Sequence, residues 1–205
     1  MMDDAAGNAP ELKADGIALV KGGRRIISDF SLLVRPGECV EITGSNGAGK
    51  TSLLRALAGI DTPSEGTIAS PGDELVYLGH QDGLKADLTV TENLQFWVGV
   101  FDAPEGEDLV AAFRLAALQD RPVRLLSAGQ RKRLAIATAF MSGRACWLLD
   151  EPLTSLDPDW ADIVASMVLD HCRTGGLAVV TTLTKSLTGK VGSVTLPGTA
   201  SELRA

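Results

Sequence analysis

The chain has 205 residues, enough for one domain that buries roughly 70% of the surface of its unfolded state. Hydrophobic residues make up 45% of the sequence, aromatic residues only 4%, and there are 22 glycines. This composition favours an α/β protein with tight turns over an aromatic-rich β-sandwich. The net charge of −7, from 26 acidic and 19 basic residues, argues against nucleic-acid binding, which needs a basic surface.

The three cysteines and the N-terminal segment indicate in which cellular compartment the protein is expected to work. Cys39 and Cys146 stand in apolar stretches typical of strands, so we expect buried, reduced thiols and a reducing cytoplasm. Residues 1–10 are acidic and have no apolar core, so we expect a disordered tail rather than a signal peptide. No window approaches eighteen apolar residues, so the sequence predicts no membrane span.

The first half of the chain is dominated by strand and turn signals. Two strands are predicted within 16–34, on either side of the Gly22-Gly23 turn. Further strands are predicted over 37–43, near 67–69 and over 75–80. A helix is predicted over 51–58, directly after a glycine-rich loop, with Gly59 as its stop.

The second half begins with a helical pattern between residues 87 and 119. Thr89 and Glu92 have the spacing of a capping box, which predicts the start of a helix that runs to 101. A second helix is predicted over 106–118. Beyond it we expect helices over 127–141 and 158–172, strands over 145–152 and 177–182, and an edge strand over 192–197. Strand–helix alternation with one helical insert predicts a mostly parallel sheet covered by helices.

The stretch GSNGAGKT, residues 44–51, has the spacing of a P-loop and lies between a predicted strand and a predicted helix. Glycines let backbone amides turn inward, and the positive end of the helix adds to their attraction for phosphate. We expect Lys50 to reach the β and γ phosphates of ATP and the Thr51 hydroxyl to hold Mg²⁺. The candidate nucleotide-binding residues here are Gly44, Ser45, Asn46, Gly47, Ala48, Gly49, Lys50, Thr51 and Ser52.

The stretch CWLLDEP ends a predicted buried strand in two carboxylates, Asp150 and Glu151. Side chains alternate along a strand, so these neighbours can take different roles. We expect Asp150 to support Mg²⁺, and Glu151 to accept a proton from the attacking water.

The stretch LLSAGQRKRLAIA, residues 125–137, places a second anion site at a helix start. Its candidate residues are Ser127, Ala128, Gly129 and Gln130. Because one P-loop already serves the phosphates of one nucleotide, this turn either caps its helix or binds a phosphate that another copy presents.

The three motifs in this order resemble the ATP-binding cassette (ABC) family over roughly residues 12–196. The resemblance implies a P-loop NTPase fold with a mostly parallel core sheet, an antiparallel β part and a short helical insert. It implies one ABC ATPase domain over 11–205, with the insert at about 82–126. It further implies that Gln81 binds Mg²⁺, that Ser127 and Gly129 bind the γ-phosphate of a second copy, and that the loop 155–157 crosses this dimer interface.

The stretches YLGHQDGLKADLTVTENLQFW and LSAGQRKRLAIA are most similar to the cytochrome c maturation ATP-binding export proteins, the CcmA family. This resemblance implies an ATPase at the cytoplasmic face of the inner membrane that works with membrane-spanning CcmB- and CcmC-type subunits. Its ATP hydrolysis would serve release of the haem-loaded chaperone CcmE. The chain has no Cys-x-x-Cys-His sequence, and we expect no direct haem binding. The alternatives are another exporter ATPase, for lipid, peptide or drug, and an ABC ATPase that acts on ribosomes or DNA.

The sequence departs from the family pattern at two places. Leu183 stands where the family has its switch histidine, so hydrolysis is expected to be slow or to depend on a neighbour such as Lys185. The adenine-stacking aromatic residue is missing near Lys21, so base selectivity is expected to be loose. The apolar residues Leu94, Trp97 and Phe101 predict either the core of the insert or a socket for a membrane subunit.

Overall fold

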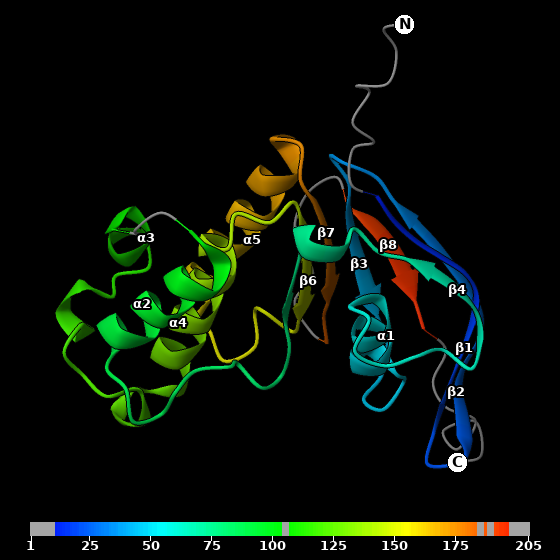
Figure 1. Ribbon diagram of the computed structural model, residues 1–205, viewed down its shortest axis with the longest axis horizontal. Coiled ribbons are helices and arrows are strands. Elements are labelled where there is room, and N and C mark those ends of the chain that lie inside the picture. Colours follow the sequence, from blue (N-terminus) through cyan, green and yellow to red (C-terminus); the bar gives the residue numbers. More distant parts are fainter. Residues whose placement is uncertain (1–10, 104–106, 184–186, 188–190, 197–205) are drawn as a thin grey trace, which may run out of the picture.

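The computed structural model describes residues 11–103, 107–183, 187 and 191–196, and its strands form two sheets (Figure 1). The larger sheet has five strands in the order β5-β6-β7-β3-β8, and all its pairings are parallel. These strands are β3 (Cys39–Thr43), β5 (Leu75–Leu78), β6 (Cys146–Asp150), β7 (Leu177–Thr181) and β8 (Gly192–Thr195). The parallel core and the edge strand predicted over 192–197 are thus confirmed.

The smaller sheet is antiparallel and has the order β2-β1-β4. Its strands are β1 (Leu12–Lys21), β2 (Arg24–Val34) and β4 (Glu65–Ala69). The Gly22-Gly23 turn joins the first two, as predicted, and both glycines have positive φ angles. This sheet supplies the antiparallel β part that the sequence resemblance implied.

The helices divide between the two faces of the parallel sheet (Figure 1). Helix α1 (Lys50–Leu57) lies between the two sheets and packs against β6, β7 and β1. Helices α4 (Ala128–Met141) and α5 (Pro158–Arg173) cover the other face. Since successive strand side chains alternate, Leu148 joins the core around α1, whereas Leu149 joins the core around α4 and α5. Strands β6 and β7 are therefore buried at every position, as strands covered on both faces must be.

The segment between β5 and α4 contains α2 (Val90–Phe101), α3 (Glu107–Ala112) and the 3₁₀ turns Ala116–Leu118 and Val123–Leu125. Both hydrogen bonds of the predicted Thr89–Glu92 capping box are present at the start of α2. Helices α2 and α3 pack against α4 (Figure 1). The limits of the insert, about 82–126, and of the single domain stay a prediction.

The prediction of one continuous helix over 106–118 is wrong. Helix α3 ends at Ala112, and Arg114 has a left-handed φ of 48°. The amide of Leu115 donates to Val110 and that of Arg114 to Ala111, the bonding pattern of a Schellman helix end. Phe113 and Leu115 are both fully buried. In a continuous helix, side chains two positions apart point in directions that differ by about 200°, so Phe113 and Leu115 could not both face the same core. Burial of both residues therefore favours an end of the helix between them.

Cys39, Cys146 and Cys172 are all buried and none forms a disulfide, which confirms the expectation of buried thiols in the strands. Within the described ranges, no helix combines the length and the apolar character that crossing a bilayer requires. The predicted disordered tail over residues 1–10 lies outside the described residues.

Candidate active site

The glycine-rich loop 44–49 connects the end of β3 to the start of α1. Gly49 has a φ of 101°, and a Cβ atom added there would lie 3.3 Å from Cγ1 of Ile27. Glycine is therefore needed at this position for both backbone conformation and space. No side chain caps α1 at Gly49, so the positive end of the helix faces the loop directly. This arrangement suits the binding of phosphate.

Lys50, the first residue of α1, is held against the loop. Its Nζ atom donates to the carbonyl oxygens of Gly44, at 2.8 Å, and Ser45, at 3.0 Å. The residue is only 5% exposed, and a buried ammonium group is costly unless it has such partners. The cation therefore has a defined position beside the amide groups of the loop.

Four residues form a hydrogen-bonded chain between α1, β6 and β7. The Thr51 hydroxyl donates to Oδ2 of Asp150 at 2.8 Å, and the Thr181 hydroxyl donates to Oδ1 of Asp150 at 2.7 Å. The amide of Glu151 donates to Oγ1 of Thr181 at 2.9 Å. Asp150 is almost fully buried, whereas Glu151 is half-buried and has a left-handed φ of 49°, which turns the chain sharply after the strand. The two adjacent carboxylates thus have different surroundings.

The Thr51 hydroxyl and the Asp150 carboxylate are hard oxygen donors of the type that Mg²⁺ prefers. Among the described residues, no cluster of three or more His, Cys, Asp or Glu side chains could hold a metal ion. Because Thr51 and Asp150 supply only two oxygen donors, an Mg²⁺ ion held here would take its other ligands from phosphate oxygens and water.

A cavity of about 900 Å³ lies beside the start of α1. It is lined by, among others, Lys21, Thr51, Ser52, Arg55, Tyr77 and Gln81. Gln81, which is exposed, is thus brought to the same cavity as the first turn of α1. Burial, and then the negative charge of Asp150, raise the pKa of Tyr77 to about 12, so this phenol stays neutral at physiological pH.

The turn 127–130 starts α4. The Ser127 hydroxyl accepts from the Gln130 amide at 3.2 Å, and the Gln130 side chain accepts from the Ser127 amide at 3.0 Å. Ser127 and Ala128 are exposed. A Cβ atom added at Gly129 would lie 3.2 Å from the carbonyl oxygen of Ser155, so this glycine permits close packing of the 155–157 loop. Among the described residues that line the 900 Å³ cavity, none belongs to this turn.

The sequence predicts either that this turn caps its helix or that it binds a phosphate presented by another copy, and the structure tests the first alternative. Ser127 does cap α4. Whether the same turn also binds a phosphate from a second copy stays a prediction, as do the roles expected for Glu151, Gln81 and Lys50.

The sequence departs from the family pattern near Lys21 and at Leu183. The first of these positions lies at this site, and the second lies just beyond β7. Lys21 lines the 900 Å³ cavity, and Tyr77 is an aromatic residue on its wall. Leu183 is 41% exposed, two residues after the end of β7. Lys185 lies outside the described residues.

Sequence reasoning missed two polar contacts at the site. The sequence predicts Thr181 only as part of a strand, and the local signal for its further contact with Asp150 is a hydroxyl residue at the end of a buried apolar run. The contact between Asp82 and Arg131, residues 49 positions apart, leaves no such local signal.

Comparison with known proteins agrees with this geometry. The ABC transporter family matches residues 27–154. The cytochrome c biogenesis ATP-binding export protein CcmA of Ruegeria pomeroyi is 42% identical over 171 residues, which cover 83% of this chain and 84% of the relative. The CcmA protein of Rhodopseudomonas palustris is 42% identical over 182 residues, which cover 83% of this chain and 90% of the relative.

Solved structures share the fold at lower sequence identity. A structure described as the ATP-binding subunit of an ABC transporter aligns with a TM-score of 0.82 at 21% identity and covers 90% of this chain and 85% of its own. A putative ABC transporter ATP-binding protein from Pyrococcus furiosus aligns with a TM-score of 0.78 at 17% identity and covers 91% of this chain and 97% of its own. The chain therefore belongs to the ABC transporter family, in the branch of the CcmA cytochrome c biogenesis ATP-binding export proteins.

Proposed function

We propose that this chain is the ATP-hydrolysing subunit of a membrane complex in c-type cytochrome biogenesis. The observation that carries the ATPase part is the chain of hydrogen bonds Thr51–Asp150–Thr181–Glu151, which joins the P-loop helix to the two carboxylates. The biogenesis part is supported by the names of relatives about 42% identical over most of the chain.

In the proposed reaction, the loop amides and the Lys50 ammonium hold the β and γ phosphates. Thr51, Asp150 and Gln81 would hold Mg²⁺, which would supply positive charge to offset the negative charge of the phosphates. The Glu151 carboxylate accepts a proton from a water molecule as that oxygen attacks the γ-phosphorus. The bond from the γ-phosphorus to the oxygen shared with the β-phosphate breaks, and ADP leaves with that oxygen.

A second copy of the chain completes the site in this proposal. The turn 127–130 of one copy, in which Ser127 and Ala128 are exposed, would place Ser127 and Gly129 against the γ-phosphate held by the other copy. Two-fold symmetry then gives two equivalent ATP sites. The absence of this turn from the described cavity lining of its own subunit is in keeping with such a role.

Membrane-spanning subunits of the CcmB and CcmC type are the other proposed partners, at the cytoplasmic face of the inner membrane. A smaller cavity of about 190 Å³ is lined by residues of β5, α2 and α4, including Trp97 and Phe101. Phe96 and Val100 on α2 are 40% and 51% exposed. Leu94, in contrast, is buried in the core, as the first of the two alternatives for the apolar residues of α2 predicts. We propose that the exposed side of α2 contacts a membrane subunit.

The proposed cargo step is release of the haem-loaded chaperone CcmE, without direct haem binding by this chain and without nucleic acid as a partner. The test is a purified complex of this chain with CcmB- and CcmC-type subunits and haem-loaded CcmE. Addition of Mg-ATP should release CcmE from the wild-type complex and not from a complex that contains Glu151→Gln. Release that needs no ATP, or a chain that hydrolyses ATP but does not join the membrane subunits, would contradict the proposal.

A further inference from the structure

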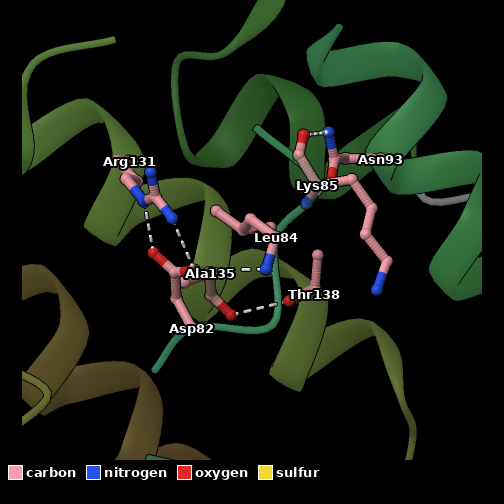
Figure 2. Close-up of polar contacts among 7 residues, drawn as sticks. All are labelled: Asp82, Leu84, Lys85, Asn93, Arg131, Ala135 and Thr138. Atoms are coloured by element: carbon pink, nitrogen blue, oxygen red, sulfur yellow. Dashed lines mark hydrogen bonds and ion pairs between the residues drawn. The ribbon is translucent and has the colours of Figure 1, made fainter. Parts of the chain in front are cut away.

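An ion pair joins the segment after Gln81 to the first turn of α4 (Figure 2). The Arg131 guanidinium donates from Nε to Oδ2 of Asp82 at 2.5 Å and from Nη2 to Oδ1 at 3.0 Å. The Asp82 side chain is only 20% exposed and that of Arg131 is 38% exposed. A two-point contact of this kind fixes both the separation and the relative orientation of the two segments.

The carboxylate is itself oriented by its own loop. The Leu84 amide donates to Oδ1 of Asp82 at 3.1 Å, and Leu84 is buried. Burial by itself raises the pKa of Asp82, but the hydrogen bonds from Arg131 and from the Leu84 amide outweigh it and keep this pKa below its usual range. Asp82 is thus an ionised, oriented partner for the guanidinium.

A second set of contacts holds the far end of the same loop. Asn93 on α2 is fully buried and bonds to Lys85 (Figure 2): its Oδ1 atom accepts from the Lys85 amide at 2.8 Å, and its Nδ2 atom donates to the Lys85 carbonyl. The same Nδ2 atom also donates to the carbonyls of Leu88 and Thr89. The Arg124 amide donates to the carbonyl of Ala86, and the Val123 amide to that of Leu88. The loop 82–89 is therefore attached to the segment 122–131 along its length.

One end of this connection lies at Gln81, a candidate magnesium ligand, and the other lies at the turn 127–130, a candidate phosphate contact. Gln81 lines the cavity that contains Thr51, and it also lines a neighbouring cavity of about 510 Å³ together with Asp82 and Arg131. At the other end, the Arg131 amide donates to the carbonyl of Ser127 at 2.8 Å. Gln81 is thus connected to the turn 127–130 through its neighbour Asp82 and the ion pair of Asp82 with Arg131.

We propose that Asp82 and Arg131 are positioning residues that hold the turn 127–130 in register with Gln81. The pair thereby connects the turn that this subunit would offer to a second copy to the loop that borders its own ATP cavity. This inference rests on the proposed function. Neither Asp82 nor Arg131 is among the described residues that line the 900 Å³ cavity beside α1, so loss of the pair should slow hydrolysis at saturating ATP without weakening the binding of ATP to the loop.

The test uses the full chain with Asp82→Asn, Arg131→Met and the double variant. Asparagine keeps an oxygen that can accept from the Leu84 amide, but it removes the charge and replaces Oδ2, which accepts from Arg131, with an amide nitrogen that only donates. Each single variant should lower kcat about tenfold or more with KM within about twofold of wild type, because misplaced catalytic groups lower the rate by such factors. The double variant should lose no more than either single variant, since the two residues act as one unit.

The matched control is Glu65→Gln, which breaks the two-point contact between Glu65 on β4 and Arg25 on β2, away from the loop 82–89. It should leave kcat unchanged. Wild-type kcat in Asp82→Asn, equal losses in the control, or losses that multiply in the double variant would each overturn the inference. A wild-type chain that does not hydrolyse ATP would instead overturn the proposed function, and the two failures are therefore distinguishable.

Discussion

Thr181 on β7 donates a hydrogen bond of 2.7 Å to Oδ1 of Asp150 on the adjacent strand β6. The same hydroxyl oxygen accepts from the amide of Glu151 at 2.9 Å. One fully buried hydroxyl therefore orients the candidate magnesium ligand and positions the backbone of the candidate general base.

Thr181→Val retains the shape of this side chain and removes both hydrogen bonds. The buried Asp150 oxygen and the Glu151 amide each lose a partner, so the free energy of unfolding should fall by about 1–3 kcal/mol. We also expect lower ATP turnover and a higher Mg²⁺ requirement. Urea unfolding and ATPase assays at several Mg²⁺ concentrations measure these effects. Thr181→Ser, which retains the hydroxyl, should stay close to wild type, and a fully active valine variant would contradict the prediction.

Glu151→Gln should abolish hydrolysis while ATP remains bound. The amide is nearly isosteric with the carboxylate but cannot accept the proton of the attacking water, so kcat should fall by about 10²–10⁴. With ATP retained, the two copies should stay associated, and light scattering after size-exclusion chromatography in Mg-ATP should detect a dimer. Glu38→Gln changes an exposed carboxylate that accepts from the Arg35 amide and serves as the control. A glutamine variant that remains monomeric in Mg-ATP would count against the role of base.

Lys50→Ala should weaken ATP binding by about a hundredfold or more, because hydrogen bonds to charged groups contribute about 1.5–3 kcal/mol each. Titration with a fluorescent ATP analogue measures this affinity. Lys13→Ala removes an exposed cation of β1 that pairs with Asp15 and should not alter binding. Unchanged affinity in Lys50→Ala would refute the assignment of this ammonium to the phosphates.

Leu183→His should raise ATP turnover. Leucine cannot donate a hydrogen bond, and an added donor to the γ-phosphate is expected to raise kcat by about tenfold or more. The side chain is 41% exposed, so the substitution should not impair folding. Leu183→Phe, which adds an aromatic ring without a donor, should give no gain. Turnover equal to or below wild type in the histidine variant would show that this position does not contact the nucleotide.

The Asp82–Arg131 pair should make stability depend on acidic pH. The pKa of Asp82 is lowered on folding, so its contribution is complete above the unfolded value of about 3.9. This contribution to stability is lost as the pH falls through the pKa that Asp82 has in the folded protein. Asp82→Asn should therefore be less stable than wild type at neutral pH, with the difference shrinking as the pH falls below the unfolded value of about 3.9. Urea unfolding of both proteins across this range tests the sign, and a difference that does not change with pH would contradict it.

Much of the site follows from local sequence. The P-loop lies between β3 and α1 because glycines and a helix start are encoded side by side, and such local preferences need no distant partner. The strands β6 and β7 were predictable for the same reason, since each is a short apolar run bounded by turn residues. The capping boxes of α2 and α4 likewise depend on residues three positions apart.

The end of α3 shows where local reasoning fails. The stretch 106–118 contains good helix formers, and helix propensity favours its continuation. Burial of both Phe113 and Leu115 requires a left-handed residue at Arg114, and that requirement arises only from the surrounding core.

The sequence alone determined the phosphate loop, the two carboxylates, the turn 127–130 and the alternation of strands and helices, because each is encoded within a few neighbouring residues. Only the tertiary structure decided that Thr181 joins Asp150 to Glu151, and that Arg131 joins Asp82. These contacts link residues 30 or more positions apart. Their formation depends on sheet order and on the packing of α4 beside the loop 82–89, for which no short stretch of sequence contains the information.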